Sequence, residues 1–269
     1  MSTTLRFTPS FILKALLFSI ITFSIVRLGF FCSQPKVSFL ITTGLPVLYK
    51  SVSSKTPWES FLKSAQSVVP LQYHDHSNGE LHNTAKAVVI NHPWCARWWL
   101  ADQIALGSLP DYLTKSMTII SSPGYSHHPR TIFLNKLGKE RVLFVQSRGE
   151  GQYAKVESAV RSVKESNATL LIYAEGSHSL LYRHRDSPPI LGPFKTGVFR
   201  AIHKVDIPVI PVVLPLEWHP KTDPISKIEI LPPVYPRPHP TYQEFVDSVY
   251  GCMLSQLFKN KQHWLQHAR

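Results

Sequence analysis

Two polar clusters directly follow short apolar runs and have residue types suited to acid–base chemistry. Asn91 and His92 come after the run at residues 88–90, and the cluster at residues 175–178, Glu-Gly-Ser-His, comes after the run at residues 169–173. An imidazole has a pKa near neutrality and can therefore serve as a general base. A single histidine at the end of a strand is also commonly structural, so His92 alone does not define a reaction.

Short apolar runs, separated by segments of helical period, must position these clusters. Most of these runs are apolar instead of alternating, as expected of strands that are covered on both faces. The predicted strands occupy residues 87–91, 117–121, 142–146, 169–173, 209–214 and 227–231. Since strand-to-helix turns of an α/β domain present polar side chains and free backbone N–H groups to one opening, the chemistry is expected there.

Two helices are predicted from apolar spacing and from a cap. Apolar residues from Val156 to Val163 recur at i, i+3, i+4 and i+7, which predicts a helix over residues 154–166. Thr241 and Glu244 form a capping box, and a broad apolar face follows them. These stripes are expected to face the core or a membrane, and we assign them no catalytic role.

The N-terminal part of the chain has the pattern of a membrane anchor. Residues 1–58 contain no acidic residue but six Lys or Arg, and residues 11–32 form a hydrophobic stretch with charges only near its ends. About 20 such residues span a bilayer, and the basic charge is attracted to anionic lipid. We therefore expect residues 1–58 to anchor the chain in a membrane and residues 59–269 to form an α/β domain. A cleaved signal peptide is the alternative interpretation, although no small-x-small site follows before Cys32.

Composition narrows the classes of protein further. The 269 residues carry a net charge of +12, and 43% of them are hydrophobic, which excludes intrinsic disorder. Three widely separated cysteines exclude a disulfide scaffold and a redox Cys-x-x-Cys motif. No nucleic acid partner is expected, because the basic charge is accompanied by neither RNP-type aromatics, nor zinc-finger spacing, nor an arginine-rich run.

Several segments, in chain order, resemble the motifs of the glycerophospholipid acyltransferase family, membrane-associated enzymes that acylate glycerol phosphate or lysophospholipids. Asn91-His92 begins the family's Asn-His-x4-Asp motif, and residues 173–179 are similar to its Phe-Pro-Glu-Gly-Thr-Arg-Ser motif. The remaining matches are residues 193–199, residues 207–212 and, more loosely, residues 142–148. The resemblance covers about residues 85–215 and implies a mixed central sheet flanked by helices.

What the resemblance implies chemically is acyl transfer from a thioester, acyl-CoA or acyl carrier protein, to a free hydroxyl. His92 is implied to remove the hydroxyl proton during attack on the thioester carbonyl, a step typically worth about 10²- to 10⁴-fold. The acyl donor is a co-substrate, and no other cofactor is expected. The residues implied to hold the acceptor and its phosphate are Arg148, Glu175, Gly176, Ser177, His178 and Lys195.

The sequence departs from the family's motifs at two positions. Arg97 stands where the family has the aspartate that orients the catalytic histidine, and a cation there lowers the basicity of His92. His178 replaces the arginine of the third motif. The acceptor is therefore expected to be an unusual lysolipid, or the chain is a catalytically silent homologue that binds lipid or acyl-CoA.

The remaining expectations concern metals, partners and location. His74 and His76 have the spacing of one face of a strand, and His127 and His128 are adjacent, but both pairs lie in polar, loop-like stretches without an evident carboxylate or cysteine partner set, so no metal site is expected. The expected partners are membrane lipid, acyl-CoA and the lysophospholipid or glycerol-phosphate acceptor. The expected location is a membrane: the endoplasmic reticulum in a eukaryote, or the inner membrane in a bacterium.

Overall fold

The structure is a computed structural model, and it describes residue 60 and residues 72–77, 79, 81–91, 109–114, 117–121, 142–145, 151–175, 191–214 and 227–267. The chain divides into two compact units, Met1–Pro46 and Val47–Arg269, and every described residue belongs to the second. The predicted anchor and its boundary after residue 58 lie outside the described residues. None of the helices in the described ranges is long and apolar enough to cross a membrane.

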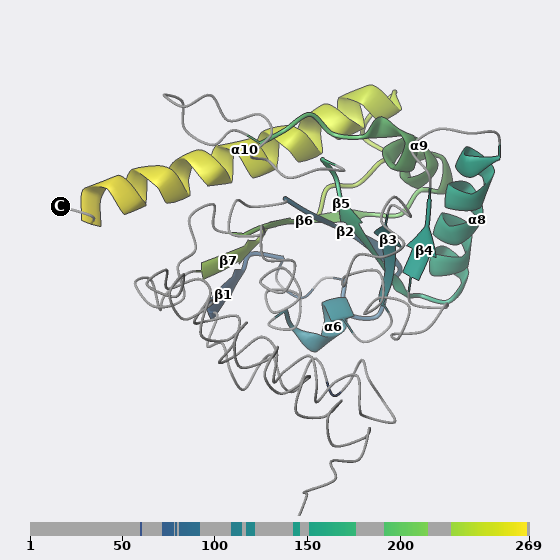
Figure 1. The fold of residues 1–269 in the computed structure, drawn as a ribbon, viewed down its shortest axis with the longest axis horizontal. Helices are drawn as coiled ribbons and strands as arrows, with labels where there is room; N and C mark the ends of the chain where they lie inside the picture. Colours follow the sequence, from purple (N-terminus) through teal and green to yellow (C-terminus); the bar gives the residue numbers. More distant parts are fainter. Residues whose placement is uncertain are drawn as a thin grey trace, which may run out of the picture. The chain divides into compact units, whose positions relative to one another are not determined.

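A seven-stranded mixed sheet forms the centre of the domain (Figure 1). Its order is β1-β7-β6-β2-β5-β3-β4, and β2 to β6 all run parallel, while β7 is antiparallel to β6 and pairs in parallel with β1. The strands are β1 (Gln72–Asp75), β2 (Lys86–Ile90), β3 (Met117–Ser121), β4 (Val142–Phe144), β5 (Thr169–Tyr173), β6 (Val209–Val213) and β7 (Lys227–Ile230). The predicted mixed sheet is confirmed, with β1 as an additional edge strand.

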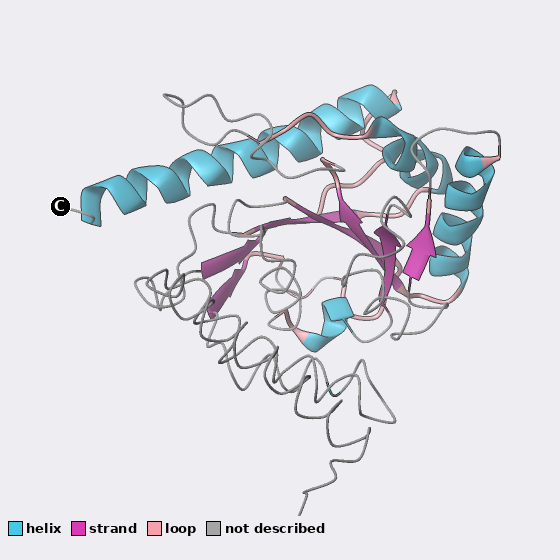
Figure 2. Cartoon of the chain, viewed as in Figure 1, coloured by secondary structure: helices cyan, strands magenta, loops and turns pink. Residues whose placement is uncertain are grey.

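Three helices cover one face of this sheet, and a short helix lies on the other side (Figure 2). On the first face are α8 (Gln152–Glu165), α9 (Thr196–Val205) and α10 (Tyr242–His267), and on the second is α6 (Asp111–Thr114). Alternate residues of β2 divide between the faces, and Ala87 and Val89 pack into the core beneath the three helices. Every residue of β2 is buried, as the continuous apolar run predicts.

The two predicted helices are both present. The apolar stripe of α8 is buried at Val156, Val160 and Val163. At the start of α10, the backbone N–H of Glu244 donates to the Thr241 hydroxyl over 3.2 Å, which is the predicted N-terminal cap. On α10, Phe245, Val249 and Met253 are buried, so both helices turn most of their apolar stripe to the core.

The face with α6 encloses a lysine. Lys86 is 1% exposed, and its Nζ donates to the backbone carbonyls of Leu81, at 2.7 Å, and Thr84, at 3.0 Å. Burial lowers the pKa of Lys86 to about 8. Nearby, the Tyr112 hydroxyl donates to Asp75 over 2.6 Å, and burial together with this bond raises the pKa of Tyr112. Two polar groups, Lys86 with its carbonyl partners and the Tyr112–Asp75 pair, thus lie near each other beside α6.

The structure corrects the interpretation of His74 and His76. Their spacing suits one face of a strand, but the polar stretch predicts a loop without a carboxylate partner; in the structure His74 lies in β1 and His76 follows it directly. Both imidazoles contact Glu229 of β7. The prediction of no partner is wrong because the carboxylate comes from a strand that is distant in sequence, 153 residues beyond His76.

Candidate active site

The carboxyl ends of β2 and β5 lie side by side at the centre of the sheet. Ile90 and Tyr173 are register partners at the last positions of the two strands. The connection after β2 includes α6, on one face, and the connection after β5 includes α9, on the other face. Open α/β sheets bind ligands beyond the strand ends where the chain diverges to opposite faces in this way.

Asn91 extends the ladder between β2 and β6 with its side chain. The residue is fully buried; its Nδ2 donates to the Leu214 carbonyl over 3.1 Å, and the Leu214 N–H donates to Asn91 Oδ1 over 2.7 Å. Only a side chain that carries both a donor and an acceptor can make this pair of bonds. Asn91 therefore fixes the position from which the chain continues to His92.

Glu175 performs the corresponding task at the end of β5. Its side chain is fully buried, and Oε2 accepts the backbone N–H of Gly192 over 2.7 Å. One residue earlier, the Ala174 carbonyl accepts the backbone N–H of Lys195 over 2.7 Å. These two bonds hold the segment before α9 against the strand end.

Aromatic residues support the same segment from α10. The Tyr250 hydroxyl donates to the Leu191 carbonyl over 2.8 Å, and its ring meets Phe194 edge to face with centroids 5.1 Å apart. Burial, together with the negative charge of Glu175, raises the pKa of Tyr250, so its hydroxyl stays protonated and donates at neutral pH.

Lys195 is the N-cap residue of α9, and its side chain is exposed. Its charge therefore lies in solvent beside the first free N–H groups of a helix. Both the ammonium group and the helix N-terminus favour negative charge, such as that of a phosphate.

The structure thus brings two of the predicted site residues, Glu175 and Lys195, to the same strand end. Glu175 binds Gly192 at one end of the segment 192–195, and the backbone of Lys195 binds Ala174 at the other end. The other predicted residues lie outside the described residues: His92, Arg148, Gly176, Ser177 and His178, together with the divergent Arg97. The described strand ends do show where these segments begin. His92 follows Asn91 directly, and Gly176 follows Glu175, so the two segments begin at the carboxyl ends of neighbouring parallel strands.

Comparison with known proteins identifies the family to which the chain belongs. The sequence matches the family model described as Acyltransferase over residues 78–215, just over half of the chain. The chain belongs to the Acyltransferase family. The match spans β2 to β6 and so includes both strand ends described above. It confirms the predicted resemblance and identifies the protein as an acyltransferase enzyme.

A solved structure shares the fold of this acyltransferase. It is the 1-acyl-sn-glycerophosphate (LPA) acyltransferase PlsC from Thermotoga maritima, with a TM-score of 0.53 and 16% sequence identity over 83% of this chain and 92% of that chain. At such low identity the likeness establishes the fold. No curated protein matches the sequence.

Sequence reasoning did not find the partners that hold the acyltransferase site in place. Leu214 and Gly192 bond the strand ends through their backbones, and the Tyr250 hydroxyl bonds the segment that Glu175 holds. Backbone groups carry no residue-specific signal. Tyr250 looks like one more member of the apolar stripe of α10, so nothing in the sequence marks its hydroxyl.

Proposed function

We propose that this acyltransferase moves an acyl chain from acyl-CoA or acyl carrier protein to the free hydroxyl of a lysophospholipid or of glycerol phosphate. The observation that supports the proposal best is the pair of strand ends fixed by Asn91 and Glu175. These residues directly precede His92 and the Gly176–Ser177–His178 segment, which match the family's base and acceptor motifs. A rigid support of this kind is what a transfer between two bound substrates requires.

In the proposed reaction, His92 accepts the proton of the acceptor hydroxyl while its oxygen attacks the thioester carbonyl. The carbon–sulfur bond then breaks, and the thiolate leaves and takes up a proton. Arg148 and Lys195 hold phosphate by charge-assisted contacts. Gly176, Ser177 and His178 line the acceptor, and Glu175 acts as a positioning residue because its carboxylate binds Gly192 inside the domain.

A membrane location completes the proposal. An acceptor with one acyl chain resides in a bilayer, and the hydrophobic, basic segment at residues 1–58 would hold the domain against that surface. The corresponding membrane is the endoplasmic reticulum in a eukaryote or the inner membrane in a bacterium.

The test is transfer of labelled acyl groups by the detergent-purified full-length chain. Wild type, His92→Ala and Arg97→Asp receive labelled acyl-CoA with a panel of lysophospholipids and glycerol 3-phosphate. Wild-type transfer to one acceptor class, with a loss of at least about 100-fold in His92→Ala, is the expected result. Unchanged transfer in His92→Ala would refute the assigned base.

Arg97 favours a second candidate, a silent homologue that binds lipid or acyl-CoA without turning it over. In that case wild type transfers nothing to any acceptor, acyl-CoA still binds, and Arg97→Asp gains activity because the carboxylate restores the basicity of His92. Binding that persists in His92→Ala distinguishes this function from catalysis.

A further inference from the structure

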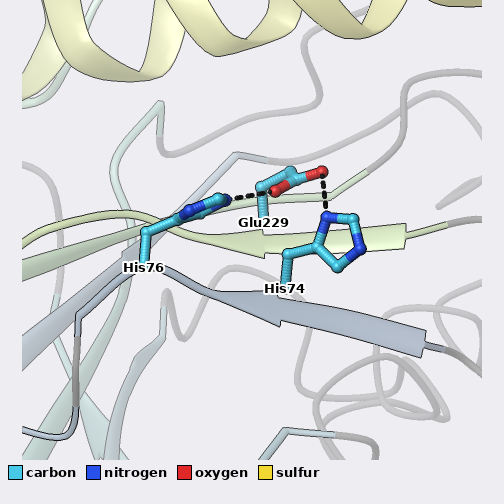
Figure 3. Close-up of side chains that lie close together, drawn as sticks. All are labelled: His74, His76 and Glu229. Atoms are coloured by element: carbon cyan, nitrogen blue, oxygen red, sulfur yellow. Dashed lines mark hydrogen bonds and ion pairs between the residues drawn. The ribbon is translucent and has the colours of Figure 1, made fainter.

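Three potential metal ligands converge from β7, from β1 and from the residue that follows β1 (Figure 3). His74 and Glu229 are register partners in this parallel pair, so their side chains leave the same face of the sheet. His76 lies two residues further along the chain and continues the pairing, because its backbone N–H donates to the Ile230 carbonyl over 2.8 Å. Backbone pairing, rather than side-chain flexibility, therefore brings the three groups together.

The distances among the three side chains are short. Nδ1 of His74 lies 3.4 Å from Oε1 of Glu229, and Nε2 of His76 lies 2.9 Å from Oε2. The potential ligand atoms all lie within 4.8 Å of one another. In a tetrahedral zinc site, metal–ligand bonds of about 2.0–2.1 Å place the ligand atoms about 3.3 Å apart. Closing the longest of these separations, at most 4.8 Å, to about 3.3 Å would complete the set around an ion.

Burial distinguishes the carboxylate from the imidazoles. The Glu229 side chain is 8% exposed, whereas those of His74 and His76 are 47% and 49% exposed. A buried carboxylate requires a positive partner or hydrogen bonds. Within the described part of the chain, the ionisable groups paired with it are the two imidazoles. A divalent cation would place positive charge beside this buried carboxylate, and the exposed imidazoles leave a path for its entry.

We propose that His74, His76 and Glu229 bind a divalent first-row transition metal ion, with Zn²⁺ the best fit. Two imidazoles and one carboxylate suit this ion, and three protein ligands leave a position open to water or to an anionic oxygen. His74 coordinates through Nδ1 and His76 through Nε2, so each ring carries its proton on the other nitrogen. The ion joins edge strand β1 to β7, independently of the proposed acyl transfer.

The test uses the full-length chain purified in detergent without a histidine tag, stripped with chelator and then titrated with Zn²⁺. Because the chain has 13 histidines, stoichiometry alone is insufficient, and variants must locate the ion. The ligand variants are His76→Gln and Glu229→Gln. The matched control is His239→Gln, which also removes one histidine but lies in the connection before α10.

We expect wild type and His239→Gln to bind one Zn²⁺ at the cluster with the same affinity, and each ligand variant to bind it at least about 10-fold more weakly. Zn²⁺ should also raise the unfolding temperature of wild type and the control, with a smaller rise in the ligand variants. Circular dichroism of the metal-free proteins establishes that the variants are folded. Co²⁺ provides a second probe, because its visible absorption is strong only in four-coordinate sites.

Equal Zn²⁺ affinity in wild type and Glu229→Gln would overturn the proposal, and so would the absence of saturable binding at micromolar Zn²⁺. Either result would mean that the cluster is a hydrogen-bonded His–Glu–His group. Acyl transfer is measured separately, so failure of the metal proposal leaves the proposed function untouched.

Discussion

Lys86 carries a charge that the folded domain disfavours, so the stability of the domain should depend on pH through this one residue. Burial lowers its pKa from the usual 10.5 to about 8. Lys86→Met is the appropriate perturbation, because methionine keeps an unbranched side chain of similar length and removes the titrating group. The loss of the hydrogen bonds to Leu81 and Thr84 does not itself depend on pH.

The direction of the effect follows from proton binding. Above about pH 8 the folded chain has released the Lys86 proton, while the unfolded chain holds it up to about pH 10.5, so the free energy of unfolding rises with pH in this window. The two pKa values differ by an amount worth about 3 kcal/mol, of which about 2 kcal/mol is gained between about pH 7 and pH 9.5. Tyr112 opposes this rise from about pH 10, because its raised pKa makes stability fall once the unfolded tyrosine ionises.

The assay is urea-induced unfolding of wild type and Lys86→Met in a non-ionic detergent, followed by tryptophan fluorescence at several pH values between about 7 and 9.5. Subtracting the two curves removes every group that titrates equally in both proteins. The wild type should gain about 2 kcal/mol relative to Lys86→Met across this range. A difference that stays constant within about 0.5 kcal/mol, or that falls with pH, would refute the assignment of a buried charged lysine.

Three further predictions concern the strand ends. Asn91→Ala leaves the N–H and the carbonyl of Leu214 buried and unpaired, so the free energy of unfolding in urea should fall by about 2–4 kcal/mol, and transfer activity should fall with it. A decrease in the free energy of unfolding below about 0.5 kcal/mol contradicts this prediction. Glu175→Gln keeps an acceptor for the Gly192 N–H, so we expect acyl transfer within about threefold of wild type. Glu175→Ala removes that acceptor and should lose about 1–3 kcal/mol of stability. Equal effects of the two variants on stability and transfer would exclude positioning as the role of Glu175. Lys195→Met should change stability by less than about 0.5 kcal/mol because the side chain is exposed, but it should raise KM for the phosphate-bearing substrate, and an unchanged KM would remove Lys195 from the binding site.

The interior strands could be predicted because burial on both faces makes each of them a continuous apolar run. Every residue of β2, β5 and β6 is buried. The predicted ends are too long at Asn91 and Leu214, where the backbone ladder stops and the Asn91 side chain takes over. A sequence pattern does not separate a residue that continues a strand with its side chain from one that continues it with its backbone.

Strand β1 and helix α9 were not predicted, for different reasons. The sequence of β1, Gln-Tyr-His-Asp, is polar because the strand lies at the edge of the sheet, and it is a strand only through pairing with distant β7. The start of α9 lies within residues 193–199, which resemble a family motif, and a motif match carries no information about helical period. For the site, Glu175 and Lys195 could be named from the motifs, but the burial of the first and the exposure of the second depend on tertiary packing.

The strand order also determines how long β2 remains without its two neighbouring strands during synthesis of the chain. Its neighbours β5 and β6 are made well after it, and 123 residues separate Asn91 from the Leu214 that completes the β2–β6 edge. At a translation rate of about 5–20 residues per second, this interval lasts roughly 6–25 s. Throughout it, an apolar strand with at least one open edge is available to other chains, which is a common route to aggregation. Slower translation would lengthen that exposure, so the yield of folded protein should depend on elongation rate and on chaperones that cover nascent strands.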